Sequence, residues 1–196
     1  NKKNQVVKTD IKKKYKITYF KSLEELYKSK IKIDMAFICT PSIHHVNEAI
    51  SLIKRNINVF IEKPLGSSFK NISELRNLIK SKKNIKHMMG YQLKFNPIIL
   101  KLKKILDKKT IGNLWYINIH HGENINDFHP YEDYRHSYAA RKDLGGGVIL
   151  CQIHELDYLL FLFEKYKIKI INSFSKKFTN LHINVEDTFV SSIQLS

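Results

Sequence analysis

Two short, continuously apolar segments stand out in the first half of the chain. Met35–Cys39 is followed by Thr40-Pro41, and Asn58–Ile61 is followed by Glu62-Lys63-Pro64. An apolar run without alternation is typical of a strand buried on both faces of a parallel sheet. We therefore predict two parallel strands, each ending at a turn.

Helical spacing of apolar residues predicts what joins these strands. Between them, apolar side chains recur every three or four positions, at Ile43, Val46, Ile50 and Ile53. Ser42 precedes this pattern and is a suitable N-cap. A strand, a helix and a strand of this length form a βαβ unit, and its crossover is expected to be right-handed.

Similar patterns predict further elements around this unit. Short strands are expected at Lys16–Tyr19 and Lys86–Met89, and helices at Ser22–Tyr27, Ile72–Ile79 and Asn96–Leu106. Pro97 lies near the start of the last helix, where its missing N–H costs little. The first half is thus predicted to be a parallel α/β layer.

The pattern changes after about residue 112. Leu114–His121 alternates as an antiparallel strand does, and residues 127–141 are polar, aromatic and turn-rich, as in a surface loop. A glycine run then leads into an apolar helix, Val148–Phe163, and two strand-like runs follow, Ile168–Phe174 and Thr188–Leu195. This order predicts two domains: an α/β domain at residues 1–109, and an α+β domain with a mostly antiparallel sheet at residues 110–196.

Composition narrows the classes of function. The formal net charge is +16, from 34 lysines and arginines against 18 acidic residues, and only four of the cations are arginines. Nucleic-acid sites favour arginine, and the lysines are spread over every predicted helix, so we interpret the charge as a solvated surface. Nucleic-acid binding stays a hypothesis that rests on charge alone.

Several other classes are disfavoured by the same composition. No apolar run is long enough to span a membrane, and the first residues do not resemble a secretory signal. Cys39 and Cys151 lie in apolar runs, far from any metal-ligand spacing, so we expect neither a disulfide framework nor a metal site. A cytoplasmic protein without a membrane or nucleic-acid partner is predicted.

Four motifs follow one another along the chain. They are Thr40-Pro41 with His45, Glu62-Lys63-Pro64, Gly90-Tyr91-Gln92 with Phe95 and Pro97, and Gly145-Gly146-Gly147 with His154 and Asp157. In this order and spacing they resemble the Gfo/Idh/MocA (glucose-fructose oxidoreductase / inositol dehydrogenase) family over about residues 15–196. The resemblance implies a partial Rossmann-like domain that binds NAD or NADP. It also implies an enzyme that oxidises or reduces a secondary hydroxyl of a sugar, nucleotide-sugar or cyclitol.

The resemblance assigns roles that agree with elementary chemistry. Three consecutive strand ends should line one crevice, because ligands of open α/β sheets bind beyond the carboxyl ends of the strands. The candidate cofactor-binding residues there are Thr40, Pro41, His45, Glu62, Lys63 and Gln92. Lys63 can donate to a substrate oxygen, and His154 can take the hydroxyl proton. The alternatives are a surface lysine at a turn, a core histidine at position 154, and a packing role for His45.

The loop before the glycine run is the candidate substrate-binding segment. Arginines interleaved with tyrosines suit an anionic or sugar ligand, through bidentate hydrogen bonds and ring stacking. The candidates are Tyr91, Arg135, Tyr138, Arg141 and His154. Packing of this loop on its own domain or on another subunit is the alternative. The family resemblance also implies a homo-oligomer that forms through the open face of the second sheet.

Three departures from the family pattern shape the expectations. No G-x-G-x-x-G precedes residue 34, and the last residues lie within a predicted strand, so weak cofactor binding and low stability are expected of this stretch alone. Leu150 occupies a position, four residues before His154, where the family usually has an aspartate. These departures leave open a second function, a non-catalytic or regulatory nucleotide- or sugar-binding protein that kept the fold.

Overall fold

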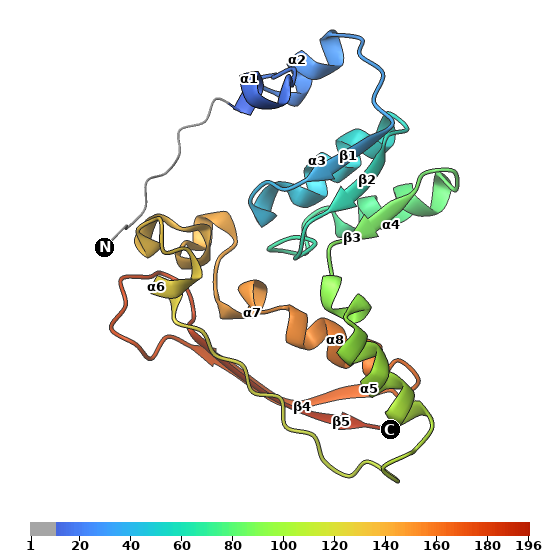
Figure 1. The fold of residues 1–196 in the computed structure, drawn as a ribbon, viewed down its shortest axis with the longest axis vertical. Helices are drawn as coiled ribbons and strands as arrows, with labels where there is room; N and C mark the ends of the chain where they lie inside the picture. The colour runs from blue at the N-terminus through green and yellow to red at the C-terminus, as the bar shows by residue number, and fades with distance from the viewer. Residues whose placement is uncertain (1–10) are drawn as a thin grey trace.

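Three parallel strands form the sheet of the first half, in the order β1–β2–β3 (Figure 1). The structure is a computed structural model that describes residues 11–196. The strands are β1 (Met35–Ile38), β2 (Asn58–Ile61) and β3 (His87–Met89). Met35 pairs with Asn58, and Val59 with His87, so all three carboxyl ends meet at one edge. The predicted parallel sheet is confirmed.

Two helices cover one face of this sheet. They are α3 (Ser42–Lys54) and α4 (Ile72–Ser81), which pack against each other. The buried core beneath them contains Ile38, Val46, Ala49, Ile50, Leu52, Ile53, Ile57, Val59, Ile61 and Leu75. The predicted capping role of Ser42 is wrong, since Pro41 is the N-cap. Ile43, predicted to face the core, is 45% exposed.

The opposite face of the sheet is open in the described part of the chain. Met35 and Phe37 of β1 are 47% and 65% exposed, and the Phe37 ring lies 5.4 Å from that of Phe60. Burial of the strands on both faces, predicted from their apolar runs, is therefore not seen here. The physical reason is that both crossover helices lie on the same side of the sheet.

The segment before β1 carries two short helices, α1 (Ile11–Tyr15) and α2 (Leu23–Lys28). The hydroxyl oxygen of Ser22 accepts a hydrogen bond from the Glu25 N–H and caps α2. The strand predicted at Lys16–Tyr19 is wrong, because residues 17–20 pair with no strand among those described.

The second half is built on an antiparallel pair, β4 (Ile168–Lys176) and β5 (Thr188–Leu195), with a bulge between Ile170 and Asn172. Two helices, α5 (Pro97–Asp107) and α8 (His154–Leu162), pack together beside it. Their small core consists of Leu159, Leu162 and Phe163, with Ile99, Leu102, Leu106, Ile117, Tyr158, Ile193 and Leu195 around it.

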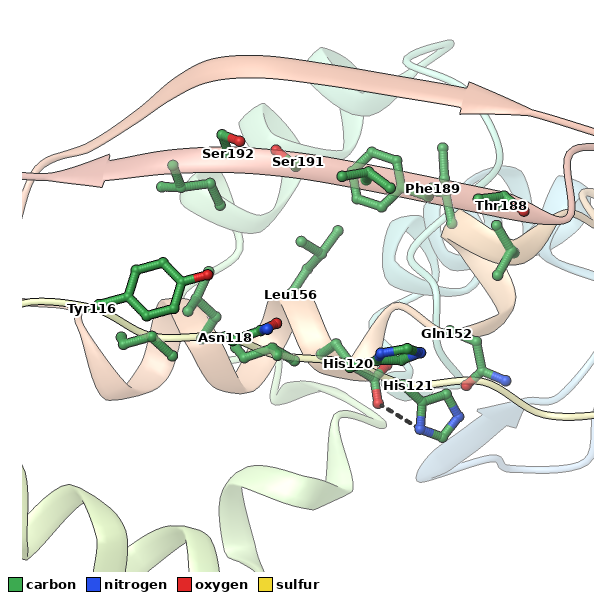
Figure 2. A pocket seen from close by; sticks show the side chains of 18 of the residues that line it. Tyr116, Asn118, His120, His121, Gln152, Leu156, Thr188, Phe189, Ser191 and Ser192 are labelled. Carbon is green, nitrogen blue, oxygen red and sulfur yellow. Dashed lines mark ion pairs between the residues drawn. The ribbon is translucent and has the colours of Figure 1, made fainter.

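The strand predicted at Leu114–His121 is wrong, although its alternating pattern is real. This segment runs along β5 without pairing, and an open cavity of about 1020 Å³ separates the two (Figure 2). Leu156 of α8 points into the cavity, and the pair formed by His121 and Glu155 lies at its end. A strand requires a hydrogen-bonding partner as well as alternation, and the described residues place none within reach of this segment.

The helix predicted from Val148 to Phe163 is interrupted. It consists of α7 (Val148–Cys151) and α8, and Gln152 between them has φ −101° and ψ 36°. The predicted surface loop, residues 127–141, contains the turns η2 (Tyr134–His136) and η3 (Tyr138–Ala140), with α6 (Ile125–Phe128) at its start and η4 (Lys142–Leu144) just after it. A further turn, η1 (Gln92–Phe95), follows β3. Within residues 11–196, no helix is long and apolar enough to cross a membrane.

Candidate active site

The motif residues lie at the carboxyl edge of the parallel sheet. The Glu62 N–H donates to the carbonyl of Ile38 at 2.9 Å, and the Gly90 N–H donates to the carbonyl of Ile61 at 2.8 Å. These bonds continue the strand ladder by one residue and fix the three strand ends beside one another. Segments that are distant in sequence are thereby brought together at this edge of the sheet.

Lys63 connects this edge to the second half of the chain. Its side chain is half-buried, and its Nζ donates to the backbone carbonyl of Cys151, the last residue of α7, at 2.7 Å. A helix C-terminus is a favourable place for a cation, because its last carbonyls lack partners within the helix. The ammonium group has three donors, so two remain for other acceptors.

His154, the first residue of α8, faces the same edge. Its ring lies perpendicular to that of Tyr91, with the ring centres 6.4 Å apart. Burial lowers the pKa of His154, and the nearby Lys63 ammonium lowers it further; neighbouring carboxylates, among them Glu155, act in the opposite direction. A lowered pKa keeps the imidazole neutral near pH 7, the form that can accept a proton.

The Nδ1 atom of His154 is enclosed and has no hydrogen-bond partner among the described residues. In a continuous helix, a residue at position 150 would lie one turn before His154 on the same face. The break at Gln152 interrupts the helix, so positions 150 and 154 do not belong to one continuous helical face. Leu150 leaves the imidazole without a carboxylate from α7.

Tyr91 lies close to both His154 and a partly buried ion pair. Lys94 Nζ is 3.2 Å from a carboxylate oxygen of Asp157 and 5.3 Å from the centre of the Tyr91 ring. Burial, and then the charge of Asp157, raise the pKa of the Tyr91 hydroxyl. The phenol thus stays protonated at neutral pH and can donate a hydrogen bond to a ligand.

The aromatic loop contributes Tyr138 to this region. Burial is the main cause that raises the pKa of Tyr138 to about 12, and the charges that add to the shift include Cys151, Glu123 and Glu62. Its electrostatic neighbours therefore include the end of β2 and the end of α7. This is the same part of the molecule as Lys63 and His154.

The two candidate arginines are already paired. Arg135 donates through Nε to both carboxylate oxygens of Asp133, each at 2.9 Å, and Arg141 pairs with Asp143. Both guanidinium groups are exposed, with side chains 56% and 44% accessible. The loop thus satisfies its own charges, and an anionic ligand would have to compete with these aspartates.

Three cofactor candidates at the strand ends differ in their surroundings. Thr40 is exposed, and its hydroxyl donates to a carboxylate oxygen of Glu48 at 2.8 Å. Gln92 is also exposed, at the start of η1. His45 is only 1% exposed, and both of its ring nitrogens contact backbone carbonyls. Its side chain is occupied inside the protein, unlike those of the other two.

Glu186 is a site residue that the sequence analysis missed. Its backbone carbonyl accepts from the Val148 N–H at 3.1 Å, and its carboxylate accepts from the Ile149 N–H at 3.3 Å. These bonds fix the first turn of α7, whose last carbonyl accepts from Lys63. Gly147, with φ +107°, lets this carboxylate approach, since a Cβ there would lie 2.3 Å from it. Only the spacing in three dimensions reveals this role.

Gly146 carries the closest backbone contact of the glycine run, and we expect its replacement by alanine to destabilise the protein. A Cβ at this position would lie 2.3 Å from the carbonyl oxygen of Tyr138 and 2.6 Å from that of Ala139. Backbone atoms cannot rotate away, so the substitution should cost about 1–3 kcal/mol or more. Urea unfolding of the full-length gene product measures this loss.

Gly122→Ala is the matched control, because nothing lies within 4 Å of a Cβ at that position. Its unfolding free energy should stay within about 0.5 kcal/mol of the unmodified protein. Equal midpoints and slopes for Gly146→Ala and Gly122→Ala would contradict the proposed close contact.

Among residues 11–196, no group of three or more histidine, cysteine, aspartate or glutamate side chains is placed to hold a metal ion.

A parallel sheet with polar groups beyond its carboxyl edge is typical of the nucleotide-binding α/β class. Residues 2–91 match the family described as "Oxidoreductase family, NAD-binding Rossmann fold", and residues 99–196 match the "GFO/IDH/MocA C-terminal domain". The chain belongs to the Gfo/Idh/MocA family of NAD-binding oxidoreductases, as the four motifs predicted.

Individual relatives agree with this assignment. The chain is 29% identical over 143 residues to an uncharacterized oxidoreductase of Streptococcus pneumoniae, covering 72% of this chain and 36% of that protein. It is 31% identical over 133 residues to trans-1,2-dihydrobenzene-1,2-diol dehydrogenase of Xenopus laevis, covering 66% and 36%. The chain thus spans about a third of the length of these two relatives.

A solved structure shows the same fold. The myo-inositol 2-dehydrogenase of Lactobacillus plantarum superposes with a TM-score of 0.75 at 22% identity, covering 90% of this chain and 51% of that one. At this identity the likeness concerns the fold, including the sheet edge at which the candidate residues lie.

Proposed function

We propose that this chain carries the catalytic lysine and histidine of an NAD(P)-dependent oxidoreductase that acts on a secondary hydroxyl of a sugar, nucleotide-sugar or cyclitol. The observation that carries the proposal is the hydrogen bond from Lys63, in the first half, to the carbonyl of Cys151, three residues before His154 in the second half. The ammonium is close enough to His154 to lower its pKa, and it holds the end of the helix just before it.

The residues at the sheet edge fit a nicotinamide cofactor. The carboxyl ends of three parallel strands converge there, and Thr40 and Gln92 are exposed beside them. A bound NAD or NADP would supply the hydride acceptor or donor. Thr40, Pro41, Glu62, Lys63 and Gln92 are the residues proposed to lie against it.

Lys63 is proposed to bind and polarise the substrate oxygen. Two of its three N–H donors are free of the contact with Cys151, and the half-buried setting strengthens a hydrogen bond to an oxygen that becomes negative. The fixed contact orients the remaining donors before substrate binds, and this orientation lowers the entropic cost of reaction.

His154 is proposed to move the proton. Its lowered pKa favours the neutral ring, which can accept the hydroxyl proton as the alcohol becomes a carbonyl. Tyr91 and Tyr138 are the flanking hydroxyl groups that remain protonated and can orient a polyol. Their rings and hydroxyls suit a sugar, whose faces are apolar and whose rim is polar.

The names of two relatives support a ring-borne hydroxyl as the reacting group. Myo-inositol and trans-1,2-dihydrobenzene-1,2-diol are both cyclic compounds with vicinal hydroxyls. Because Arg135 and Arg141 are paired with aspartates, the described loop offers less support for an acidic sugar than for a neutral polyol. The arginines and tyrosines of this loop remain candidates for substrate binding.

The test is cofactor-dependent turnover by the full-length gene product. Purified protein is mixed with NAD⁺ or NADP⁺ and a panel of cyclitols, neutral sugars and nucleotide-sugars, and the absorbance of reduced nicotinamide is followed. We expect turnover with at least one neutral ring polyol. Tight binding of the cofactor with no turnover on any substrate, in either direction, would contradict the proposal.

A second function is favoured by one observation. Nδ1 of His154 has no hydrogen-bond partner among the described residues, as a protein that has lost catalysis but kept its ligand would show. A non-catalytic or regulatory binding protein would bind nucleotide or sugar in a fluorescence titration without turning it over. The same purified protein therefore separates the two functions.

We further propose that the protein forms a homo-oligomer through the open face of the β4–β5 sheet. Phe174 and its cross-strand partner Val190, which lie on the face opposite Ile193 and Leu195, are each 48% exposed. An apolar surface of this kind is typical of a protein interface.

A further inference from the structure

His45 is buried between two backbone carbonyls at the sheet edge. Its Nδ1 lies 2.7 Å from the carbonyl oxygen of Pro64, and its Nε2 lies 2.7 Å from that of Thr40. The residue is 1% exposed, so water does not reach the ring from the surface. Thr40 follows β1 by two positions and Pro64 follows Lys63 directly, so one ring spans the ends of two strands.

A carbonyl oxygen accepts hydrogen bonds and cannot donate them. A neutral imidazole has one N–H and one bare nitrogen, and the bare nitrogen would direct its lone pair at an oxygen lone pair only 2.7 Å away. Both contacts become hydrogen bonds only when both nitrogens carry a proton. Such charge-assisted bonds are short and about twice as strong as neutral ones.

We propose that His45 is held as an imidazolium that ties the Thr40 turn to the Lys63-Pro64 turn, and that it is a positioning residue for Lys63. The bond to the Pro64 carbonyl fixes the Pro64–Leu65 peptide, one residue beyond Lys63. From there the lysine side chain reaches the Cys151 carbonyl, so His45 and α7 hold Lys63 from its backbone and from its tip.

Some of the charges around His45 favour the imidazolium, and others oppose it. His45 is in the first turn of α3, where the helix dipole disfavours a cation. Glu48, one turn further along, accepts from the hydroxyl of Thr40, the residue whose carbonyl receives Nε2. At the other end of the ring, Glu62 and Lys63 precede Pro64. The carboxylates and the two carbonyl dipoles favour the cation, and burial, α3 and the Lys63 ammonium oppose it.

The two hydrogen bonds of His45, to the Pro64 carbonyl and to the Thr40 carbonyl, can be tested separately with amide side chains. The amide nitrogen of asparagine corresponds in reach to Nδ1, and that of glutamine to Nε2. His45→Asn therefore keeps the donor to Pro64, whereas His45→Gln keeps the donor to Thr40. Each variant loses one hydrogen bond and the charge, so the two form a matched pair that differs in which turn is released.

We expect His45→Gln to lower kcat of the full-length gene product about tenfold or more, with little change in KM, because Lys63 loses its backbone anchor. His45→Asn should retain most of kcat. Both variants should unfold at a lower temperature. A packing role alone would lower stability in both and leave kcat per folded molecule equal, and that result overturns the positioning role. This kinetic comparison rests on the proposed function.

The protonation state is tested without activity. Nitrogen-15 NMR of histidine-labelled full-length protein at about pH 7.5, above the ordinary histidine pKa of about 6.5, should show two protonated ring nitrogens for one histidine. His45→Gln should remove that signal and so assign it. A single protonated nitrogen for His45 overturns the imidazolium, whether or not the protein turns over any substrate. If the protein is inactive but both ring nitrogens of His45 are protonated, the imidazolium that joins Thr40 to Pro64 is supported and the proposed function fails.

Discussion

Replacing Lys63 by alanine in the full-length gene product is expected to lower kcat/KM by about two orders of magnitude or more, the usual cost of removing a donor that stabilises developing negative charge. The half-buried ammonium donates to the Cys151 carbonyl and is one of the charges that lower the pKa of His154. Alanine removes both the donor to the substrate oxygen and the link to α7. Steady-state rates with the best substrate of the panel measure the effect.

Lys54→Ala is the control for this experiment. Lys54 lies on α3 in the same half of the chain, and its ammonium pairs with Glu74 on the surface, with a side chain that is 55% exposed. Exposed pairs contribute little, so this variant should keep its rate and its stability. Lys63→Arg keeps the charge but replaces a compact ammonium by a wide planar group, and it should recover only part of the activity. Unchanged kcat/KM in Lys63→Ala would refute the catalytic role of the lysine.

Much of the first half was predictable because local patterns suffice there. Apolar runs that end at Thr40-Pro41 and Glu62-Lys63-Pro64 indicated buried strands, and the parallel order then required their ends to meet. Nothing in the sequence separates a strand covered on one face from one covered on both. That depends on which side the crossover helices take, and α3 and α4 take the same side.

The second half was predicted less well for identifiable reasons. Leu114–His121 alternates like a strand, but pairing is a property of two segments, and the alternation of one cannot supply it. The apolar run from Val148 has no proline or glycine inside it to mark the break at Gln152. The break matters for function, because it changes which residues share a face with His154.

The charge pairing and the burial of single side chains were also not predicted from the sequence. Arg135 and Arg141 each have an aspartate two positions away, and this spacing allows a local ion pair that competes with a ligand. The family motif placed His45 near the cofactor. The structure gives a different reason for a histidine there, the two carbonyls that its ring joins.

The second large effect concerns His154. His154→Asn, which keeps the shape of the ring edge but accepts no proton at neutral pH, should lower kcat for alcohol oxidation by about two orders of magnitude or more. In the unmodified protein, burial and Lys63 lower the pKa of His154, so the neutral base persists below the ordinary value of about 6.5. Oxidation should therefore continue as the pH falls past that value, and decline only as the pH falls through the lowered pKa.

A second variant tests whether Lys63 contributes to the lowered pKa of His154. Lys63→Met removes the cation and keeps the side-chain bulk, so the pKa of His154 should rise toward its ordinary value while burial still lowers it. An NMR titration of the His154 ring in both proteins measures this directly, and the acid limb of any residual activity should move to higher pH in the same direction. A His154 titration that does not move in Lys63→Met would mean that the two side chains do not share one site. That result would separate the lysine from the histidine as catalytic partners, because a donor and a base that act on one hydroxyl must lie close enough for their charges to interact.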